Sequence, residues 1–366
     1  MLQRNLLLLI LTLSSFSLLA AKEEPAAPTS YYHATVLMYH HISTSTPPST
    51  STSPADFIKH LDMLKADGFQ VWPLERVVQH LKRRRPMPDK TAVITFDDGY
   101  ISVYEEALPI LKDRQLPFTI FVNADLINAN HPLYMNWAQL KEAQKTGGLI
   151  ANHTLSHAYL IRKLDDENNL DWLARVRHEI DGNQQEIIKN LGSAPKIFAY
   201  PYGEYNAEVQ KLVQQMGYVA FGQQSGAANP YSGLLALPRY AANGSSANPS
   251  SLNAKLSALP FPLVSEEPTS TVLNGNDRRP SLVLTMLPGD YRLKQLRCYG
   301  PDAQLLNIKT KQLADGNLRI TIDSDKDLAV GRPRYNCTAP HLTDNRYFWF
   351  TRQWLMPKVD GSWYDF

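Results

Sequence analysis

The strongest constraint on this chain is the alternation of short apolar runs with helical patterns between residues 34 and 263. Runs such as 92–96 and 118–122 are almost entirely apolar, which is typical of strands buried on both faces. Residues 57–64 instead carry apolar side chains at helical spacing. The alternation predicts a mostly parallel sheet with crossover helices, and seven plausible strands favour a barrel over an open doubly wound sheet.

The pattern changes after residue 263. Residues 264–281 are rich in polar side chains and contain few large apolar ones, which predicts a linker. From residue 282 onward, short runs of alternating apolar and polar residues are separated by Pro-Gly, Gly-Pro and Asp-Gly turns. Residues 282–366 are therefore predicted to form a small β-sandwich-like domain of antiparallel strands. Its tryptophans, including Trp349 and Trp354, suit the sandwich core and the interdomain contact, or would stack on sugar rings if exposed.

The N-terminus carries a candidate targeting segment. Arg4 precedes an apolar stretch from Leu6 to Leu19 that ends in two alanines, which is typical of a cleaved secretory signal peptide over residues 1–20. An uncleaved anchor is the alternative, but the stretch is short and is interrupted by Thr and Ser. No other segment is apolar enough to cross a bilayer, so the sequence predicts a soluble protein exported to the periplasm or out of the cell.

Charge and cysteine content narrow the class of partner. Lys and Arg total 37 against 35 for Asp and Glu, so a formal charge of +2 gives no reason to expect a nucleic-acid partner. Cys298 and Cys337 are the only cysteines, and neither has metal or redox spacing. In an oxidising compartment they are predicted to form one disulfide, with two buried free thiols as the alternative. The oligomeric state is not indicated.

Two clusters of ionisable side chains follow predicted strands. Asp97 and Asp98 come directly after residues 92–96, and His153 and His157 follow a second apolar run. Taken alone, the acids fit a helix-capping turn and the histidines a polar surface turn. The carboxyl ends of parallel strands meet at one edge, where barrels place their sites. There, Asp98 and the two histidines would form the two-His, one-carboxylate ligand set of a hydrolytic metal centre.

Two further motifs lie at strand ends. Pro201-Tyr202-Gly203 follows the apolar residues 197–200, and its turn either exposes backbone N–H groups to a pocket or simply packs a tyrosine. His40 and His41 follow the first predicted strand. Either could serve as a general acid or base, or be a hydrogen-bonded core histidine.

Together these motifs resemble the polysaccharide deacetylases, the NodB-homology or carbohydrate esterase family 4 fold. The resemblance spans residues 34–263 and rests on residues 95–99, 153–157 and 198–203. The position of His40 before the two aspartates is most similar to the poly-N-acetylglucosamine deacetylases, whose motifs are circularly permuted. The resemblance implies that residues 34–263 form a catalytic domain with a distorted (β/α)7 barrel of the NodB type.

The resemblance also implies roles for the clustered residues. Asp98, His153 and His157 would hold a divalent metal, with zinc preferred and Co²⁺, Ni²⁺ or Fe²⁺ also suited. Asp97 would be the general base that activates water. The implied reaction is removal of N-acetyl groups from an N-acetylglucosamine-containing polysaccharide, with release of acetate.

The remaining roles are affected by two departures from the family. The Tyr202 backbone N–H, after Pro201, would stabilise the oxyanion. Many relatives carry an arginine where this chain has Ala199, so another group must orient the base. The usual Leu-x-His motif late in the barrel is missing, which transfers the role of acid toward the leaving amine to His40.

Two other functions remain open from the sequence. An O-acetyl polysaccharide esterase would use the same metal, base and oxyanion site, with less need of His40. A sugar-binding module that has lost turnover is the non-enzymatic alternative. The sequence does not choose among poly-N-acetylglucosamine, chitin oligomers and peptidoglycan as the polymer.

Overall fold

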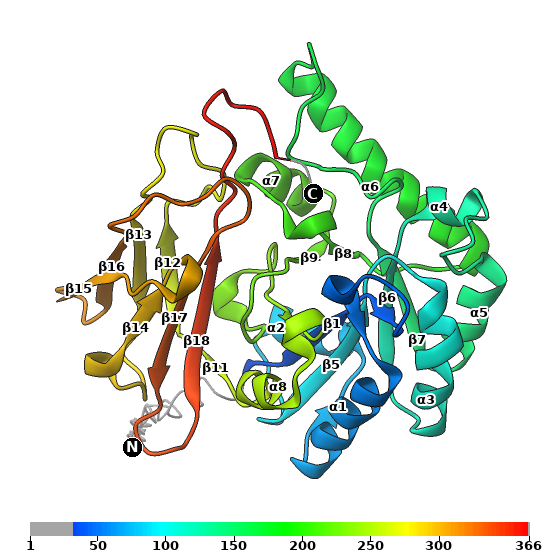
Figure 1. Ribbon diagram of the computed structural model, residues 1–366, viewed down its shortest axis with the longest axis horizontal. Coiled ribbons are helices and arrows are strands. Elements are labelled where there is room, and N and C mark those ends of the chain that lie inside the picture. Colours follow the sequence, from blue (N-terminus) through cyan, green and yellow to red (C-terminus); the bar gives the residue numbers. More distant parts are fainter. Residues whose placement is uncertain (1–31, 365–366) are drawn as a thin grey trace, which may run out of the picture.

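The computed structural model describes residues 32–364, so the predicted signal peptide lies outside the described residues. Its larger part is built on one eight-stranded sheet in which every pairing is parallel, with the order β10-β1-β5-β6-β7-β8-β9 and with β4 beside β5 (Figure 1). The strands are β1 (Thr35–Tyr39), β4 (Gln70–Val71), β5 (Thr91–Phe96), β6 (Phe118–Val122), β7 (Gly148–Asn152), β8 (Ile197–Ala199), β9 (Val219–Phe221) and β10 (Tyr240–Ala241). Residues of β1, β5 and β6 are buried throughout, which explains their apolar sequences.

The segment before β10 brings the two edges of this sheet together. Leu237 bridges to Phe221 at the β9 edge, while Tyr240 pairs with Leu37 of β1. One short piece of chain therefore hydrogen-bonds to both edges and curves the sheet into a barrel-like half-cylinder. The predicted parallel barrel-type fold is confirmed.

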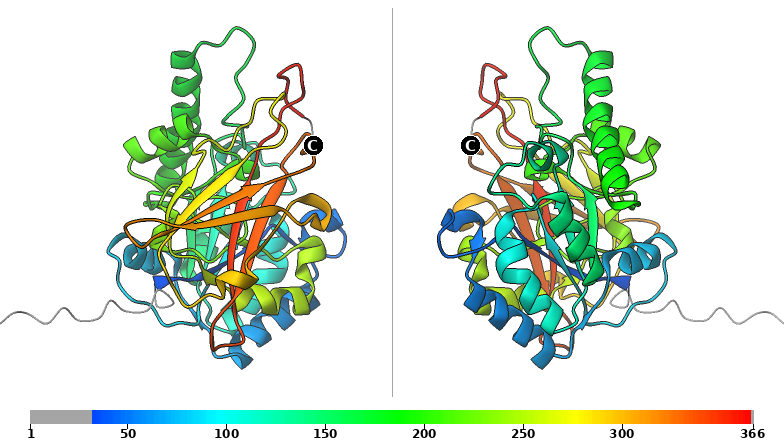
Figure 2. Two further views of the ribbon diagram at one scale, coloured as in Figure 1. Left: turned by 90° about the vertical axis from the view of Figure 1, so that its left-hand side faces the viewer. Right: turned by 90° about the vertical axis from the view of Figure 1, so that its right-hand side faces the viewer.

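Helices cover the outside of the curved sheet (Figures 1 and 2). They are α1 (Pro54–Ala66), α2 (Leu74–Lys82), α3 (Leu108–Asp113), α4 (Ala124–Asn128), α5 (Trp137–Lys145), α6 (Asn169–Leu191), α7 (Ala207–Gln215) and α8 (Pro249–Leu256). Polar side chains begin several of them: Ser53 caps α1 and Asn136 forms a capping box on α5. Gly192 ends α6 in the left-handed conformation. None of the helices within residues 32–364 combines the length and apolar content needed to span a membrane.

The C-terminal part contains two four-stranded sheets that pack face to face, seen in front of the barrel in the left view of Figure 2. One has the order β11-β18-β17-β14 and the other β12-β13-β16-β15. Their strands are β11 (Leu259–Pro260), β12 (Leu263–Glu267), β13 (Leu282–Met286), β14 (Arg297–Tyr299), β15 (Asn307–Gln312), β16 (Leu318–Asp323), β17 (Arg334–Pro340) and β18 (Tyr347–Gln353). A disulfide joins Cys298 to Cys337, which are direct partners on β14 and β17.

Two short strands lie near the predicted boundary between the barrel domain and the linker. β11 pairs with β18, although its residues were assigned to the barrel domain, and β12 occupies the start of the predicted linker. β12 is not evident from the sequence, because it is mostly exposed on both faces and carries no apolar pattern. A small additional pairing, β2 (His41–Ile42) with β3 (Ser51–Thr52), lies in the loop after β1.

Candidate active site

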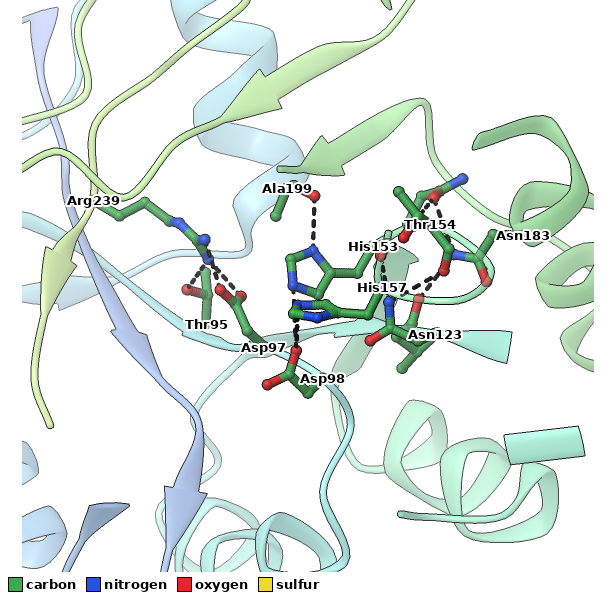
Figure 3. Close-up of polar contacts among 12 residues, drawn as sticks. Thr95, Asp97, Asp98, Asn123, His153, Thr154, His157, Asn183, Ala199 and Arg239 are labelled. Atoms are coloured by element: carbon green, nitrogen blue, oxygen red, sulfur yellow. Dashed lines mark hydrogen bonds and ion pairs between the residues drawn. The ribbon is translucent and has the colours of Figure 1, made fainter. Parts of the chain in front are cut away.

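The predicted site residues converge at the carboxyl ends of the parallel strands. Asp97 and Asp98 follow β5, and His153 follows β7. His157 lies in the loop beyond, and its ring points toward the same place (Figure 3). Because the strands run parallel, the residues that follow each of them meet at one mouth of the barrel.

Three side chains form a candidate metal-binding cluster. Asp98 Oδ1 lies 3.3 Å from His153 Nε2 and 3.2 Å from His157 Nε2 (Figure 3). The three possible ligand atoms lie within 4.8 Å of one another. Asp98 Oδ1 and His153 Nε2 are buried and have no hydrogen-bond partner within residues 32–364. Buried polar atoms that converge in this way fit a divalent ion.

The protonation of the histidines also suits a cation. His153 Nδ1 lies 2.7 Å from the Ala199 carbonyl oxygen, which only accepts, so Nδ1 carries a proton and Nε2 is the ring atom that would offer a lone pair to a metal. Burial lowers the pKa of His157 to about 4, which keeps this imidazole neutral. Burial would also lower the pKa of His153, but the Asp98 carboxylate raises it above the ordinary value. The Asp98 carboxylate therefore stabilises a positive charge placed between it and His153.

A buried amide network holds the loop after β7. Asn123 donates to the His153 carbonyl, and Asn152 Oδ1 accepts from the Thr154 N–H at 3.0 Å. Asn183 of α6 donates to the same Asn152 Oδ1 at 3.0 Å. Thr154 has a φ of 70°, a backbone conformation that costs free energy and is held here by these contacts. Sequence analysis missed these asparagines, although Asn152 directly precedes His153.

Asp97 is held by an arginine that sequence analysis also missed. Arg239, just before β10, donates from Nη1 to Asp97 Oδ1 at 2.6 Å and from Nη2 to Oδ2 at 2.7 Å, and both side chains are fully buried. Its Nε donates to the Gly222 carbonyl at 2.9 Å, which fixes the guanidinium plane. Burial alone would raise the pKa of Asp97, but the guanidinium outweighs it and lowers that pKa. The carboxylate therefore stays ionised at neutral pH.

Arg239 therefore orients the Asp97 carboxylate. The sequence analysis had left this group unidentified, because residue 199 is alanine. A signal was present: Arg239 is the single charged residue in the apolar segment 234–242. A buried arginine in such a segment requires an acidic partner. Asp97 was the acid for which the sequence analysis had no orienting group. Its position was hidden because the two residues are 142 positions apart.

The two histidines after β1 have different surroundings. His40 lies close enough to Asp97 and Asp98 for its charge to lower the pKa of both carboxyl groups. Its Nδ1 is buried without a hydrogen-bond partner within the described part of the chain. His41 instead stacks on Tyr100, with ring centroids 3.6 Å apart. His40 therefore faces the carboxylates, and His41 packs beside them.

The Pro201-Tyr202-Gly203 turn borders the cluster. The Tyr202 ring lies 4.4 Å from the His157 ring and stacks on Tyr159 at 3.9 Å. Gly203 has a φ of 68°, and a Cβ there would lie 2.7 Å from Gln223 Cβ, so only glycine fits. Pro201 is buried and fixes the entry to the turn. The turn thus lies beside the possible metal ligands.

A family comparison agrees with this geometry. The family model described as "Polysaccharide deacetylase" matches residues 84–221, a range that contains Asp97, Asp98, His153 and His157. Over this range the chain is similar to the polysaccharide deacetylases. The YxkH protein of Bacillus subtilis, named for the same family, is 30% identical over 186 residues, which cover 50% of this chain and 63% of YxkH.

Other relatives and solved structures extend the comparison. The poly-beta-1,6-N-acetyl-D-glucosamine N-deacetylase of Staphylococcus aureus is 27% identical over 197 residues, covering 52% of this chain and 67% of that protein. A solved structure of the Streptococcus pyogenes deacetylase PplD in complex with acetate has a TM-score of 0.55 and 25% identity, covering 61% of this chain and 98% of that chain. The structure of IcaB from Ammonifex degensii, at 24% identity and a TM-score of 0.55, shares the fold over 62% of this chain and 98% of that chain. The match to YxkH spans less than two thirds of its length.

Proposed function

We propose that this protein is a metal-dependent polysaccharide deacetylase, a hydrolase that removes N-acetyl groups from an N-acetylglucosamine-containing polysaccharide after export from the cytoplasm. The observation that carries the proposal is the cluster of Asp98, His153 and the half-buried His157 beside Asp97, which Arg239 keeps ionised. The naming of relatives as poly-beta-1,6-N-acetyl-D-glucosamine N-deacetylases supports the choice of reaction and of substrate class.

The cluster would hold a divalent metal, and we propose zinc, because two imidazoles and one carboxylate with open positions suit it. When bound, such an ion lowers the pKa of water and polarises the acetyl carbonyl. Asp97 then accepts the proton of the attacking water, since its pKa is held low and its orientation is fixed by two hydrogen bonds.

The other two roles belong to groups at the rim of the cluster. The Tyr202 backbone N–H, positioned by Pro201, donates to the oxygen on which negative charge develops. His40, acting as its imidazolium, gives a proton to the departing sugar amine, because it lies close enough to interact with both carboxyl groups at the cluster. Without that proton an amine is a poor leaving group, so His40 matters more for amides than for esters.

The decisive test is acetate release by the purified protein from N-acetylglucosamine oligomers and polymers, after chelation and after reloading with zinc or cobalt. We expect release only with metal, no release from His153→Ala, and bound metal without release from Asp97→Asn. The latter variant separates base chemistry from metal binding. A tightly bound metal with no release from any glycan would overturn the proposal and favour the O-acetyl esterase or the sugar-binding module.

His40→Gln tests the acid role. We expect amide cleavage to fall by about 10²-fold or more and cleavage of an activated acetyl ester to fall much less. Equal losses on both substrates would contradict this role. Mass measurement of the exported protein would test cleavage after residue 20, which we expect from the sequence.

A further inference from the structure

The face that the C-terminal sheet turns toward the barrel carries a row of polar side chains. Residues of β17 and β18 that are opposite one another on this face are Arg334 with Gln353, Asn336 with Thr351, and Thr338 with Trp349. Their neighbours on β17, such as Tyr335 and Cys337, point into the sandwich core. Together with the chain at 299–303 and Ser225 of the barrel, this face lines an open groove of about 750 Å³.

Arg334 is the unusual member of this groove. Its Nε is buried and has no hydrogen-bond partner within residues 32–364, and its Nη2 reaches only Gln353 Oε1, at 3.3 Å. Arg162 and Arg352 also bury an unpartnered Nε, but each has a carboxylate within 4 Å, Glu204 and Glu266 respectively. Within the described chain, no carboxylate lies within 4 Å of Arg334.

The electrostatic surroundings of Arg334 are those of an anion site. Burial lowers the pKa of its guanidinium, and the neighbouring charge of Arg332 acts in the same direction. Asp302, which is exposed, is the one acidic residue among those that line the groove. Asn336 accepts from the Thr351 hydroxyl at 2.8 Å through Oδ1, so its amide N–H groups remain as further donors. A half-buried guanidinium whose Nε has no partner and no counter-charge is costly unless a ligand supplies one.

The groove is physically connected to the candidate active site. Gln353, which contacts Arg334, donates from Nε2 to the Gly203 carbonyl at 3.0 Å. Arg332 donates to the Tyr202 carbonyl. The Pro201-Tyr202-Gly203 turn that borders the His157 ring is therefore held by Arg332, which lines the groove, and by Gln353, which contacts the groove residue Arg334.

Trp349 gives the groove an aromatic wall. It is half-buried, and its Nε1 donates to Thr351 Oγ1 at 3.0 Å, which fixes the indole at the groove. Trp354, by contrast, is fully buried in the sandwich core against Tyr335 and cannot meet a ligand. An aromatic ring beside hydrogen-bond donors and a cation is a surface that suits a sugar bearing a carboxylate.

We propose that this groove is a subsite for an acidic residue of the substrate, in which the Arg334 guanidinium and the Asn336 amide bind the carboxylate of a uronic acid. The inference rests on the proposed deacetylase function, because it places the acidic sugar on the same chain as the acetylated one. It narrows the substrate class to glycans that contain both N-acetylated and carboxylate-bearing sugars.

Calorimetric titration of the metal-loaded full chain tests the subsite, with acetate assayed in the same samples. The probes are hyaluronan oligosaccharides, in which N-acetylglucosamine alternates with glucuronate, and N-acetylglucosamine oligomers of equal length. We expect hyaluronan to bind roughly tenfold or more tightly, with an affinity that falls as salt is raised. Equal affinity for the two glycans, or a preference that salt leaves unchanged, would overturn the proposal without reference to any variant.

Variants then locate the preference. Arg334→Gln should reduce hyaluronan affinity to that of the neutral oligomer, and Arg334→Lys, which keeps the charge but not the planar fork, should retain part of the difference. Arg319→Gln, which removes a half-exposed arginine from the other sheet, should leave the preference intact. A preference that survives in Arg334→Gln excludes this site. Binding preference without acetate release would separate failure of the proposed reaction from failure of the subsite.

Discussion

Buried charge is paired at the barrel mouth but unpaired on the face of the C-terminal sheet that is turned toward the barrel. At the mouth, Asp97 and Arg239 are both fully buried and form a two-pronged ion pair. On the sheet face, the buried Arg334 Nε has no partner and no carboxylate within 4 Å in the described chain. The contrast teaches that an ion pair between two residues of the chain holds a reacting carboxylate in place, whereas an unpaired cation can bind an anionic group of a ligand.

The largest expected effect comes from breaking the pair at the mouth. Arg239→Gln leaves Asp97 buried without its cation, so we expect the free energy of unfolding to fall by about 3–5 kcal/mol. Denaturant unfolding measures this loss. Activity should fall as well, because the remaining carboxylate is protonated more readily and loses its orientation. Unchanged stability and an unchanged pH profile would show that the pair does not control Asp97.

The C-terminal part depends instead on an apolar core and one crosslink. Removing the disulfide as the double variant Cys298→Ala, Cys337→Ala should lower its stability by about 4 kcal/mol in the chain-entropy model, since the bond spans 39 residues. Chemical unfolding with and without reductant, followed by tryptophan fluorescence, reports the difference. If reductant leaves the unfolding curve of the wild type unchanged, this account of the region is wrong.

Lys255 of α8 is a second buried cation of the barrel region, and it extends the comparison to the pH dependence of stability. Its Nζ donates to the Ala241 carbonyl at 3.3 Å, and burial lowers its pKa to about 8. Between about pH 8 and its usual pKa the unfolded chain binds more protons than the folded one, so stability should rise with pH across this window.

Lys255→Met should remove that rise and leave a flatter profile, as measured by thermal unfolding from pH 7 to about 10.5. The matched control is Lys59→Met, because Lys59 is an exposed lysine of α1. The rise should remain in Lys59→Met, and a rise that persists in Lys255→Met would mean that another group causes it.

The smallest expected effect completes the comparison. Arg334→Met removes a buried cation that has no counter-charge, so stability should change by no more than about 1 kcal/mol and in the favourable direction. Melting temperature is a sufficient measure. A loss as large as that of Arg239→Gln would mean that Arg334 is paired in solution and that the two regions do not differ.

Much of the fold followed from local pattern. Fully apolar runs predicted buried parallel strands, and the change to alternation after residue 281 predicted the all-β part. The edge strand β12 was missed because its exposed residues have no apolar pattern. The pairing of β11 with β18 was not predicted, because β18 lies far along the chain. Pairing between distant segments leaves little trace in a short run of residues.

The sequence by itself determined which residues reach the barrel mouth, because strand ends are set locally and each of Asp97, Asp98 and His153 directly follows a strand. Only the tertiary structure decided which side chains contact these residues. Arg239 contacts Asp97 across 142 positions once the segment before β10 joins both edges of the sheet, and the Arg334 groove exists only where the sandwich meets the barrel. The physical reason is that a buried charge acquires its partner from the packing of distant segments, which local residue patterns do not encode.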